Sequence, residues 1–288
     1  MKKDITELFC YIDDFCKVAD AFQKTGKIGE ERNPTRVSSL TISEIMTIML
    51  LYHTSPCKNF KYFYKSYAQL YKPEFPNLVS YQRFIALVPR TLPYFLCLLK
   101  CLLVNKGQIH FVDATSLPVC HNKRIKRHKV FKIFAKRGKT SMGWFYGLKL
   151  HLIINRKGEL ANFKLTSGNC DDRKPVPEMA KELSGLMIGD KGYIGENLFK
   201  YLFKNGIKLI TGIKKNMKNK LLEIPEKILL RKRSIIETVF DYLKNKMALS
   251  HTRHRSPINA FVHIFSTLVS YSLNPKKPRI SIQNLIQN

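Results

Sequence analysis

The chain has 288 residues, of which 50 are Lys or Arg and 21 are Asp or Glu, giving a formal net charge of +29 at pH 7. A hydrophobic fraction of 44% and an aromatic fraction of 11% exclude a disordered basic tail, because enough apolar surface is present to build a core. A folded protein with this charge favours a polyanionic partner, most often nucleic acid. A membrane-surface protein is the alternative, but the basic residues run along the whole chain instead of clustering beside one apolar helix.

The sequence predicts neither an export signal nor a membrane span. Its start, MKKDITELFCYIDDF, has acids where a signal peptide is apolar. The longest apolar run, residues 94–104, is interrupted by Lys100 and is too short to cross a bilayer. The seven cysteines lack any Cys-x-x-Cys spacing, which makes a zinc site the weaker interpretation and favours reduced thiols. We therefore expect a cytoplasmic protein that is not bound to a membrane.

The first third of the chain is predicted to be helical. Thr41 precedes an apolar run, and Glu44 follows it by three residues, which is the spacing of a capping box. A helix should therefore begin directly after Thr41. A shorter helix should follow Ser80, with Gln82 and Arg83 in its first turn. These two side chains suit base edges, so a helix-turn-helix is one hypothesis. An ordinary helical bundle with a basic surface is the other, and the sequence does not separate them.

The pattern changes to strands after a break at Lys106 and Gly107. Residues 108–119 form a β-type run with Asp113 near the middle, and a carboxylate among apolar neighbours needs a cation or the open end of a sheet. Residues 120–140 then carry Lys or Arg at about every second position, a density that suits contact with a phosphate backbone. The candidate DNA contacts in this segment are Lys123, Arg124, Lys126 and Arg127.

The next elements are expected to be a hairpin, a helix, a strand, a helix and a strand. They lie at residues 144–154 with 159–166, 175–183, 186–188, 196–205 and 208–213. Asp171 and Asp172 precede the first of these helices and are interpreted as its N-terminal caps. Asp190 follows a short apolar strand between two glycines, where open α/β sheets place their chemistry, although a turn residue is the ordinary interpretation.

Residues 231–247 are predicted to form one amphipathic helix that faces a core. At about 100° per residue, Arg233, Glu237 and Lys244 lie within roughly 40° of one another along one border of its apolar stripe. An exposed Arg–Glu pair at i, i+4 would give the same pattern. A further apolar helix at residues 260–273 and a basic tail follow.

Three acids, Asp113, Asp190 and Glu237, could converge at one edge of a mixed sheet. Three oxygen ligands without His or Cys suit Mg²⁺ or Mn²⁺ and not zinc. Two such ions about 4 Å apart would clamp a phosphodiester, one activating the attacking oxygen and the other stabilising the leaving oxygen. The pattern therefore favours phosphoryl transfer on nucleic acid.

These motifs resemble those of DDE transposases of the bacterial insertion-sequence type, which have a ribonuclease-H-like catalytic core. The motifs that carry the resemblance are Arg-x3-Glu-x6-Lys at Arg233, Glu237 and Lys244, Asp-x-Gly-Tyr at Asp190, Gly192 and Tyr193, and FVDATSLPV around Asp113. Such transposases often have a Tyr three residues before the Arg, where this chain has Leu230. Asp172 lies where related sequences often carry an acid after Gly-Asn.

The resemblance implies an α/β fold with a ribonuclease-H-like mixed sheet flanked by helices, preceded by a mostly α-helical N-terminal domain. The implied domains are residues 1–105 for DNA binding, residues 106–274 for catalysis and residues 275–288 as a basic tail. The implied partners are double-stranded DNA, as the element's terminal inverted repeats and the target, and at least a second copy of the chain in a synaptic complex. The implied location is the bacterial cytoplasm, at the nucleoid.

Site roles are also implied by the resemblance. Two Mg²⁺ or Mn²⁺ ions would be present, Asp113 bridging both while Asp190 and Glu237 each complete one. Arg233 and Lys244 would meet DNA phosphates or steady the acids, and Lys191 and Tyr193 would position oxygens of the DNA backbone. Three alternatives remain open from the residues: a ribonuclease-H-like nuclease without strand transfer, a non-catalytic DNA-binding protein derived from a transposase, and a basic RNA- or ribosome-associated protein.

Overall fold

A computed structural model of the chain describes residues 5–25, 38–105, 107–141, 143–213, 217, 222–250 and 254–280. Residues 281–288 of the predicted tail and Lys106 of the predicted break lie outside the described residues. The chain divides into two compact units. The first comprises Met1–Leu102, Lys246–Leu249 and His254–Leu273, and the second comprises Leu103–Asn245, Ser250–Arg253 and Asn274–Asn288. The predicted domain limits stay a prediction, although helix α10 (Pro257–Leu273) belongs to the first unit by its packing and not to the second.

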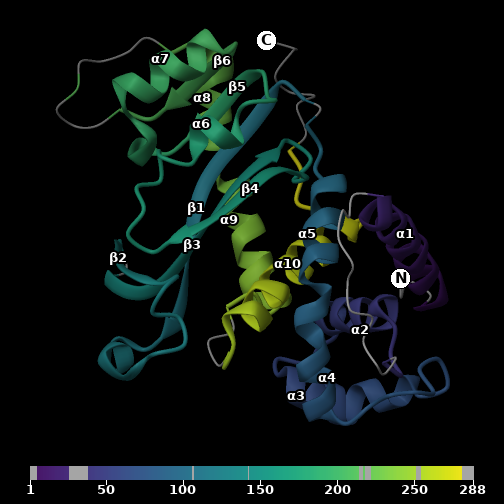
Figure 1. Ribbon diagram of the computed structural model, residues 1–288. Coiled ribbons are helices and arrows are strands. Elements are labelled where there is room, and N and C mark those ends of the chain that lie inside the picture. The colour runs from purple at the N-terminus through teal and green to yellow at the C-terminus, as the bar shows by residue number, and fades with distance from the viewer. Residues whose placement is uncertain are drawn as a thin grey trace. The chain divides into compact units, whose positions relative to one another are not determined.

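The described elements of the first unit are all helical, as the sequence predicts (Figure 1). They are α1 (Ile5–Thr25), α2 (Ile42–Thr54), α3 (Phe60–Tyr62), α4 (Tyr81–Leu87), α5 (Leu92–Cys101) and α10 (Pro257–Leu273), with short π- and 3-10-helical turns at Phe63–Tyr67, Ala68–Tyr71 and Val88–Thr91. The predicted capping box is confirmed, because the Glu44 amide donates to Thr41 Oγ1 at 3.1 Å and the Thr41 amide donates to Glu44 Oε2 at 2.7 Å. Ser80 likewise caps α4 through the Arg83 amide.

One helical stretch of this unit, Tyr81–Cys101, is long and apolar enough by length and composition to cross a membrane. A 3-10 turn interrupts it, and its largest apolar side chains, Phe84, Phe95 and Leu99, are fully buried inside the unit. Helices α5 and α2 both pack against α10. This stretch is therefore part of the unit's core.

The second unit is built on a six-stranded mixed sheet. Its strands are β1 (Ile109–Cys120), β2 (Lys136–Thr140), β3 (Gly143–Asn155), β4 (Leu160–Ser167), β5 (Gly185–Gly189) and β6 (Ile207–Thr211). The order is β2-β3-β1-β5-β6, and β4 pairs with the part of β3 that β2 leaves free. Pairs within β1 to β4 are antiparallel, whereas β1–β5 and β5–β6 are parallel. This is the mixed sheet that the predicted ribonuclease-H-like core requires.

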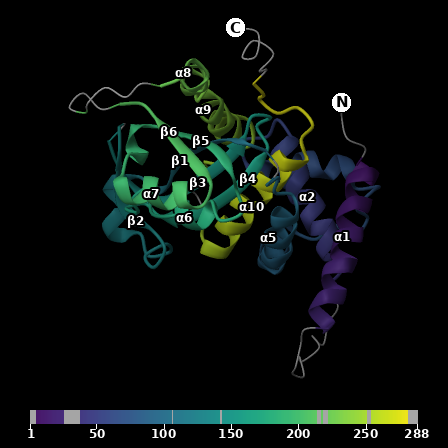
Figure 2. The same ribbon diagram turned by 90° about the horizontal axis from the view of Figure 1, so that it is seen from above.

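Helices cover both faces of the sheet (Figure 2). On one face lie α6 (Val176–Met179) and α7 (Glu196–Lys204), and on the other lie α8 (Ile224–Arg231) and α9 (Ser234–Asp241). Helix α7 packs on β6 and α6 on β4, while α8 contacts β5 and β6 and α9 contacts β1. The predicted fold class, a mixed sheet flanked by helices after a helical N-terminal region, is confirmed.

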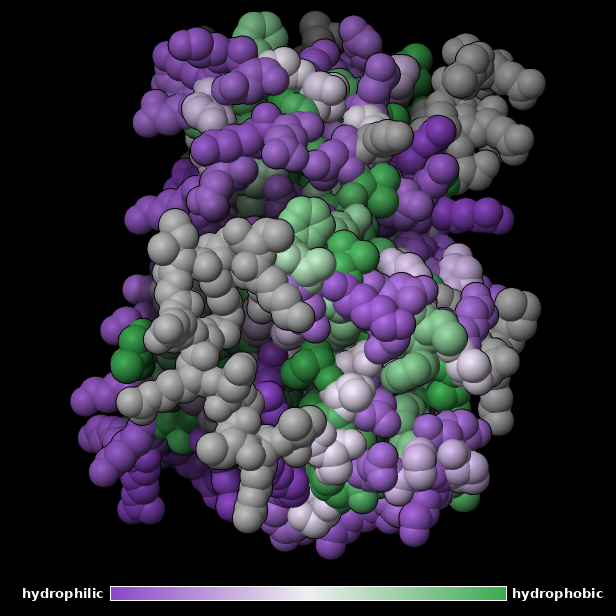
Figure 3. All heavy atoms as spheres, turned by 45° about the vertical axis from the view of Figure 1, so that its right-hand side comes forward, coloured by the Kyte–Doolittle hydropathy of each residue, from purple (hydrophilic) through white to green (hydrophobic). Residues whose placement is uncertain are grey.

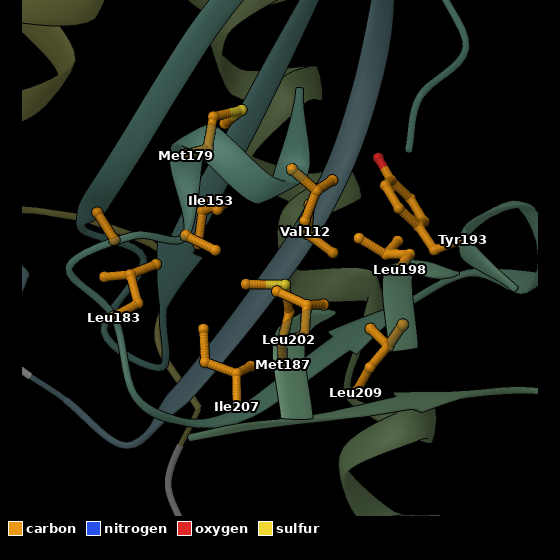
Figure 4. Packing of buried hydrophobic residues seen from close by; sticks show 13 residues of the cluster. Val112, Ile153, Met179, Leu183, Met187, Tyr193, Leu198, Leu202, Ile207 and Leu209 are labelled. Atoms are coloured by element: carbon orange, nitrogen blue, oxygen red, sulfur yellow. The ribbon is translucent and has the colours of Figure 1, made fainter. Parts of the chain in front are cut away.

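An apolar cluster fills the space between the sheet and the α6–α7 layer (Figure 4). Val112 of β1 and Ile153 of β3 meet there, as their paired register requires, together with Met187 of β5. Because side chains alternate along a strand, the neighbours of Val112 point to the opposite face, where α9 lies. Asp113 is one of these neighbours. On the outside, hydrophilic residues cover much of the face drawn in Figure 3, with hydrophobic ones exposed between them.

The predicted single helix over residues 231–247 is wrong in its continuity. Helix α8 ends at Arg231, two turn residues follow, α9 begins at Ser234, and a π-helical turn, η6 (Tyr242–Lys246), comes after it. Bonds from Ile235 to Lys232 and from Ile236 to Arg233 are of the tighter i to i+3 kind. Helix α8 contacts β5 and β6, whereas α9 contacts β1.

Candidate active site

Asp113 occupies the middle of β1 on the face that carries α9. Its side chain is 21% exposed, and its Oδ2 lies 3.5 Å from Nη1 of Arg233. Its Oδ1 accepts the Ala114 amide at 2.8 Å. A partly buried carboxylate in a strand thus has the cationic partner that the sequence required.

Arg233 joins two of the predicted acids. While Nη1 faces Asp113, Nη2 lies 2.6 Å from Oε1 of Glu237. The Arg233 side chain is 25% exposed and that of Glu237 55%, so the pair does not lie on a fully solvated helix face. The simple i, i+4 pair does exist, but the same guanidinium also reaches across to β1. The exposed-pair interpretation is therefore incomplete.

Two of the predicted acids act electrostatically on the third. The pKa of Asp113 is raised to about 6, chiefly by burial and to a smaller extent by the charges of Asp190 and Glu237, while the Ala114 amide and Arg233 oppose the rise. Asp190 directly follows β5, and β5 is the parallel neighbour of β1. Asp190 therefore lies at the end of the strand that runs beside the one carrying Asp113. The structure thus brings Asp190 and Glu237 each within electrostatic range of Asp113, and the catalytic role of the three acids stays a prediction.

Asp190 begins the short 3-10 helix η5 (Lys191–Tyr193) that follows β5. Its Oδ1 accepts the Gly192 amide at 2.7 Å, which fixes the carboxylate at the strand's end. The Lys191 side chain is exposed and passes close to Gly212, where an added Cβ would lie 3.2 Å from Lys191 Cε. The turn-residue interpretation of Asp190 is thus correct as local structure and compatible with a site at this edge.

Tyr193 is placed differently from a surface DNA contact. The side chain is 1% exposed and its ring packs at the edge of the apolar cluster beside Leu198 (Figure 4). Among the described residues, none forms a hydrogen bond with its hydroxyl oxygen. Burial, and then the charges of Asp113, Asp172 and Asp190, raises the pKa of this phenol. Its predicted role as a DNA contact stays a prediction, and in this conformation the hydroxyl oxygen is buried like the rest of the side chain.

The interpretation of Asp171 and Asp172 as helix caps is wrong. The residue that precedes α6 is Pro175, and no side chain caps this helix. Asp171 instead accepts from the amide and the guanidinium of Arg173, which lowers the pKa of its carboxyl. Asp172 Oδ1 accepts from Nζ of Lys149 at 2.9 Å. The acid that related sequences often carry after Gly-Asn is therefore tied to strand β3.

Sequence reasoning missed the pocket beside this ion pair. It has a volume of about 360 Å³ and is lined by Lys139, Lys149, Gly168, Asn169, Cys170, Asp171, Asp172 and Gly192. Gly192 connects it to the turn after Asp190. Lys149, which is 12% exposed, donates to the Cys170 carbonyl as well as to Asp172. No local signal marks Lys149, because it lies in a run that otherwise has the composition of an apolar strand.

The remaining predicted DNA contacts are spread over both units. Lys244 is half-buried in η6, and burial lowers its pKa. The basic residues of the 120–140 segment are exposed on the 3-10 helix η4 (Asn122–Arg127), namely Lys123, Arg124, Lys126 and Arg127. Gln82 and Arg83 are exposed in the first turn of α4, in the other unit. Their contacts with DNA stay predictions.

The donor chemistry of the acids fits a hard divalent cation. Within the described ranges, no three His, Cys, Asp or Glu side chains are arranged to hold a metal ion. Arg233 contacts two of the three carboxylates, so a cation already lies where their charges meet. Three carboxylates without nitrogen or sulfur ligands suit Mg²⁺ or Mn²⁺. Binding by all three requires Arg233 to release Glu237.

The candidate site thus combines one acid within strand β1, a second just after the parallel strand β5 and a third on helix α9. Residues 104–257, more than half of the chain, match the family model described as "Transposase DDE domain". The chain belongs to this family of transposases, and the resemblance inferred from the three motifs is confirmed.

Solved structures give a weaker likeness. The Mos1 transposase paired-end complex with the left transposon end shares 9% identity, covering 90% of this chain and 87% of that chain, with a TM-score of 0.25. A Mos1 mariner paired-end complex with Mn shares 10% identity over the same fractions, also with a TM-score of 0.25. A likeness at this level carries no argument about this chain. A search of curated proteins found no match.

Proposed function

We propose that this transposase binds the terminal inverted repeats of its own insertion sequence and performs metal-dependent strand cleavage and strand transfer. The observation that carries the proposal is that the Arg233 guanidinium contacts both Asp113 and Glu237, while the charges of Asp190 and Glu237 both act on Asp113. In a chain of net charge +29, acids without a task beside a phosphate-binding surface would weaken binding. Their convergence supports a site that holds cations.

In this proposal Asp113, Asp190 and Glu237 would hold Mg²⁺ or Mn²⁺, two ions being expected from the number of donors. When bound, the ions supply activation of an attacking oxygen and stabilisation of the leaving oxygen. Arg233 keeps the carboxylates of β1 and α9 close before the ions enter and is then free to contact a DNA phosphate. Partial burial of Asp113 strengthens every charge interaction at this edge by lowering the local dielectric.

The proposed partner is double-stranded DNA, held by the exposed basic residues of η4 and by the first unit. Pairing of two element ends requires at least two copies of the chain, so a homodimer or larger assembly is proposed for the synaptic complex. The bacterial cytoplasm, at the nucleoid, is the corresponding location.

The test uses labelled DNA fragments that flank the reading frame, incubated with the full-length protein and Mg²⁺. Wild-type protein should nick the element ends, whereas Asp113→Asn should bind them with wild-type or higher affinity and nick none. Asp241→Asn removes the same charge from an exposed position on α9 and is the matched control. Cleavage by Asp113→Asn at the wild-type rate would refute the proposed site.

A second arm separates transposition from simple cleavage. Pre-cleaved ends and a supercoiled target plasmid are incubated with wild-type protein and Mg²⁺. Joined products are expected, because the same site activates water for cleavage and a DNA 3′ hydroxyl for transfer. Cleavage without joining would identify a nuclease, and tight binding without either reaction would identify a non-catalytic DNA-binding protein.

A further inference from the structure

Trp144 is the only tryptophan of the chain and is 52% exposed. It lies near the start of β3, where β2 is its partner strand. A large aromatic ring that stays half in water gives up stabilisation that burial would provide, since a buried aromatic contributes a large share of a core's apolar area. The proposed cleavage site does not involve this ring.

Two cations from β2 lie over the Trp144 ring. Arg137 Cζ is 4.9 Å and Lys139 Nζ is 5.7 Å from the ring centroid. Both side chains are exposed, and Lys139 is the direct cross-strand partner of Trp144. Such cation–π contacts also stabilise the hairpin. With both cations in place, Trp144 as a residue is still 52% exposed. An aromatic face beside two cations is the combination that binds a nucleobase together with its phosphates.

The surroundings of Trp144 favour nucleic acid over other ligands. Asn122, the first residue of the basic helix η4, donates its side-chain amide to the Trp144 carbonyl at 2.6 Å. This bond attaches the four exposed cations of η4 to the strand that carries the ring. Ile133, 84% exposed, lies in the same basic segment.

The pairing of β1 with β3 shows where Trp144 lies relative to the acid cluster, which is Asp113, Asp190 and Glu237. Asp113 is paired with Leu152 of β3, and Trp144 is an even number of residues from Leu152, so both point to the same face of the sheet. Eight residues at ~3.4 Å each separate the two positions by roughly 27 Å along β3. At ~3.4 Å per nucleotide, a DNA strand covers this distance in about eight nucleotides.

We propose that Trp144, flanked by Arg137 and Lys139, stacks on an unpaired base of the DNA strand that is held at the acid cluster. Stacking is the step that requires an exposed ring face, since a paired base has both faces covered by its neighbours. Arg137 and Lys139 hold the phosphates on either side of the stacked base. The connection to the acid cluster rests on the proposed function, whereas the stacking itself does not.

The chain contains its own reporter for this proposal. Because Trp144 is the sole tryptophan, all emission excited at 295 nm comes from this ring. Full-length protein is titrated with a single-stranded DNA oligonucleotide, with the same sequence as a blunt duplex, and with polyphosphate as a charge-only ligand. Binding of each DNA is followed in parallel by anisotropy of a label on its end. Saturable quenching by the single strand, exceeding that by the duplex and absent with polyphosphate, is expected.

Substitutions of Trp144 test how much its ring contributes to the affinity for single-stranded DNA. Trp144→Ala should weaken single-strand binding roughly 5- to 150-fold, the range that alanine substitution of stacking aromatics gives, while Trp144→Phe should restore most of it. Phe203→Ala removes an aromatic of 66% exposure from α7 and should leave binding unchanged. Circular dichroism confirms that each variant is folded.

Two results would overturn the proposal. One is unchanged tryptophan emission while anisotropy shows that the single strand is bound, and the other is equal quenching by polyphosphate. Absence of Mg²⁺-dependent cleavage by the wild type would refute the proposed function instead, and would leave a positive stacking result in place.

Discussion

Replacing the central aspartate should make the metal-free protein more stable while it destroys activity. In the folded chain the pKa of Asp113 is about 6 against its usual 3.8, chiefly because of burial. A shift of about 2 units corresponds to ~3 kcal/mol by which the ionised form is disfavoured on folding. The side chain is only 21% exposed, so solvent screens this cost little. Asp113→Asn removes the charge and keeps an oxygen for the Ala114 amide.

The sign of the pH dependence follows from the direction of the shift. Because the folded pKa is raised, the stability that protonated Asp113 contributes is complete below pH ~3.8 and is lost as pH rises through 6. The advantage of Asp113→Asn should therefore grow by about 2 kcal/mol between pH 4.5 and pH 8. Urea unfolding followed by circular dichroism in EDTA measures it at each pH. Asp14→Asn, at a position that is 78% exposed in α1, is the control and should show no such trend. A variant that is less stable than wild type at pH 8, or whose advantage does not change with pH, would refute the reasoning.

Three further substitutions test separate contacts. Arg233→Lys should lower the free energy of unfolding by roughly 1 kcal/mol and slow nicking, because a single ammonium cannot contact both carboxylates as the guanidinium fork does. Equal stability of the variant and the wild type in urea would contradict this. Lys149→Met should lower the free energy of unfolding by about 1–3 kcal/mol, because Asp172 and the Cys170 carbonyl both lose their hydrogen-bond donor. An unchanged free energy of unfolding in urea would mean that water replaces the ammonium group. Gly147→Ala should lower the free energy of unfolding by several kcal/mol or prevent folding, because the added Cβ would lie 2.1 Å from the Leu117 carbonyl oxygen. A soluble variant that melts at the wild-type temperature would contradict this, since it would mean that β1 and β3 move apart at no cost.

Local chemistry explains which parts of the fold the sequence predicts. The capping box at Thr41 and the hairpin before β4 both depend on residues within a few positions of one another. In that hairpin Gly158 has φ +69, a conformation that glycine adopts without strain, and its amide donates to the Asn155 carbonyl. Apolar runs within a few neighbouring residues likewise predict the strand that carries Asp113 and the strand that precedes Asp190. Their order then indicates a mixed sheet.

Features that depend on distant partners were not predictable. Strand β2 reads KRGKT, a sequence without apolar alternation, and becomes a strand because the edge of β3 is available to pair with it. Asp172 has the local signature of a helix cap, yet its partner is Lys149, 23 residues away in the chain. The turn at Arg233 contains neither Gly nor Pro, and packing on different strands of the sheet imposes it. Tertiary contacts override local preference in each case.

The central claim is that Asp113, Asp190 and Glu237 share divalent ions. Binding of Mn²⁺ to the complex of full-length protein with element-end DNA, counted by electron paramagnetic resonance, measures this directly. The account predicts two bound ions per active site in the wild type, and weakened or lost binding in Asp113→Asn, Asp190→Asn and Glu237→Gln alike. Wild-type Mn²⁺ affinity and stoichiometry in any one of these three variants would contradict it.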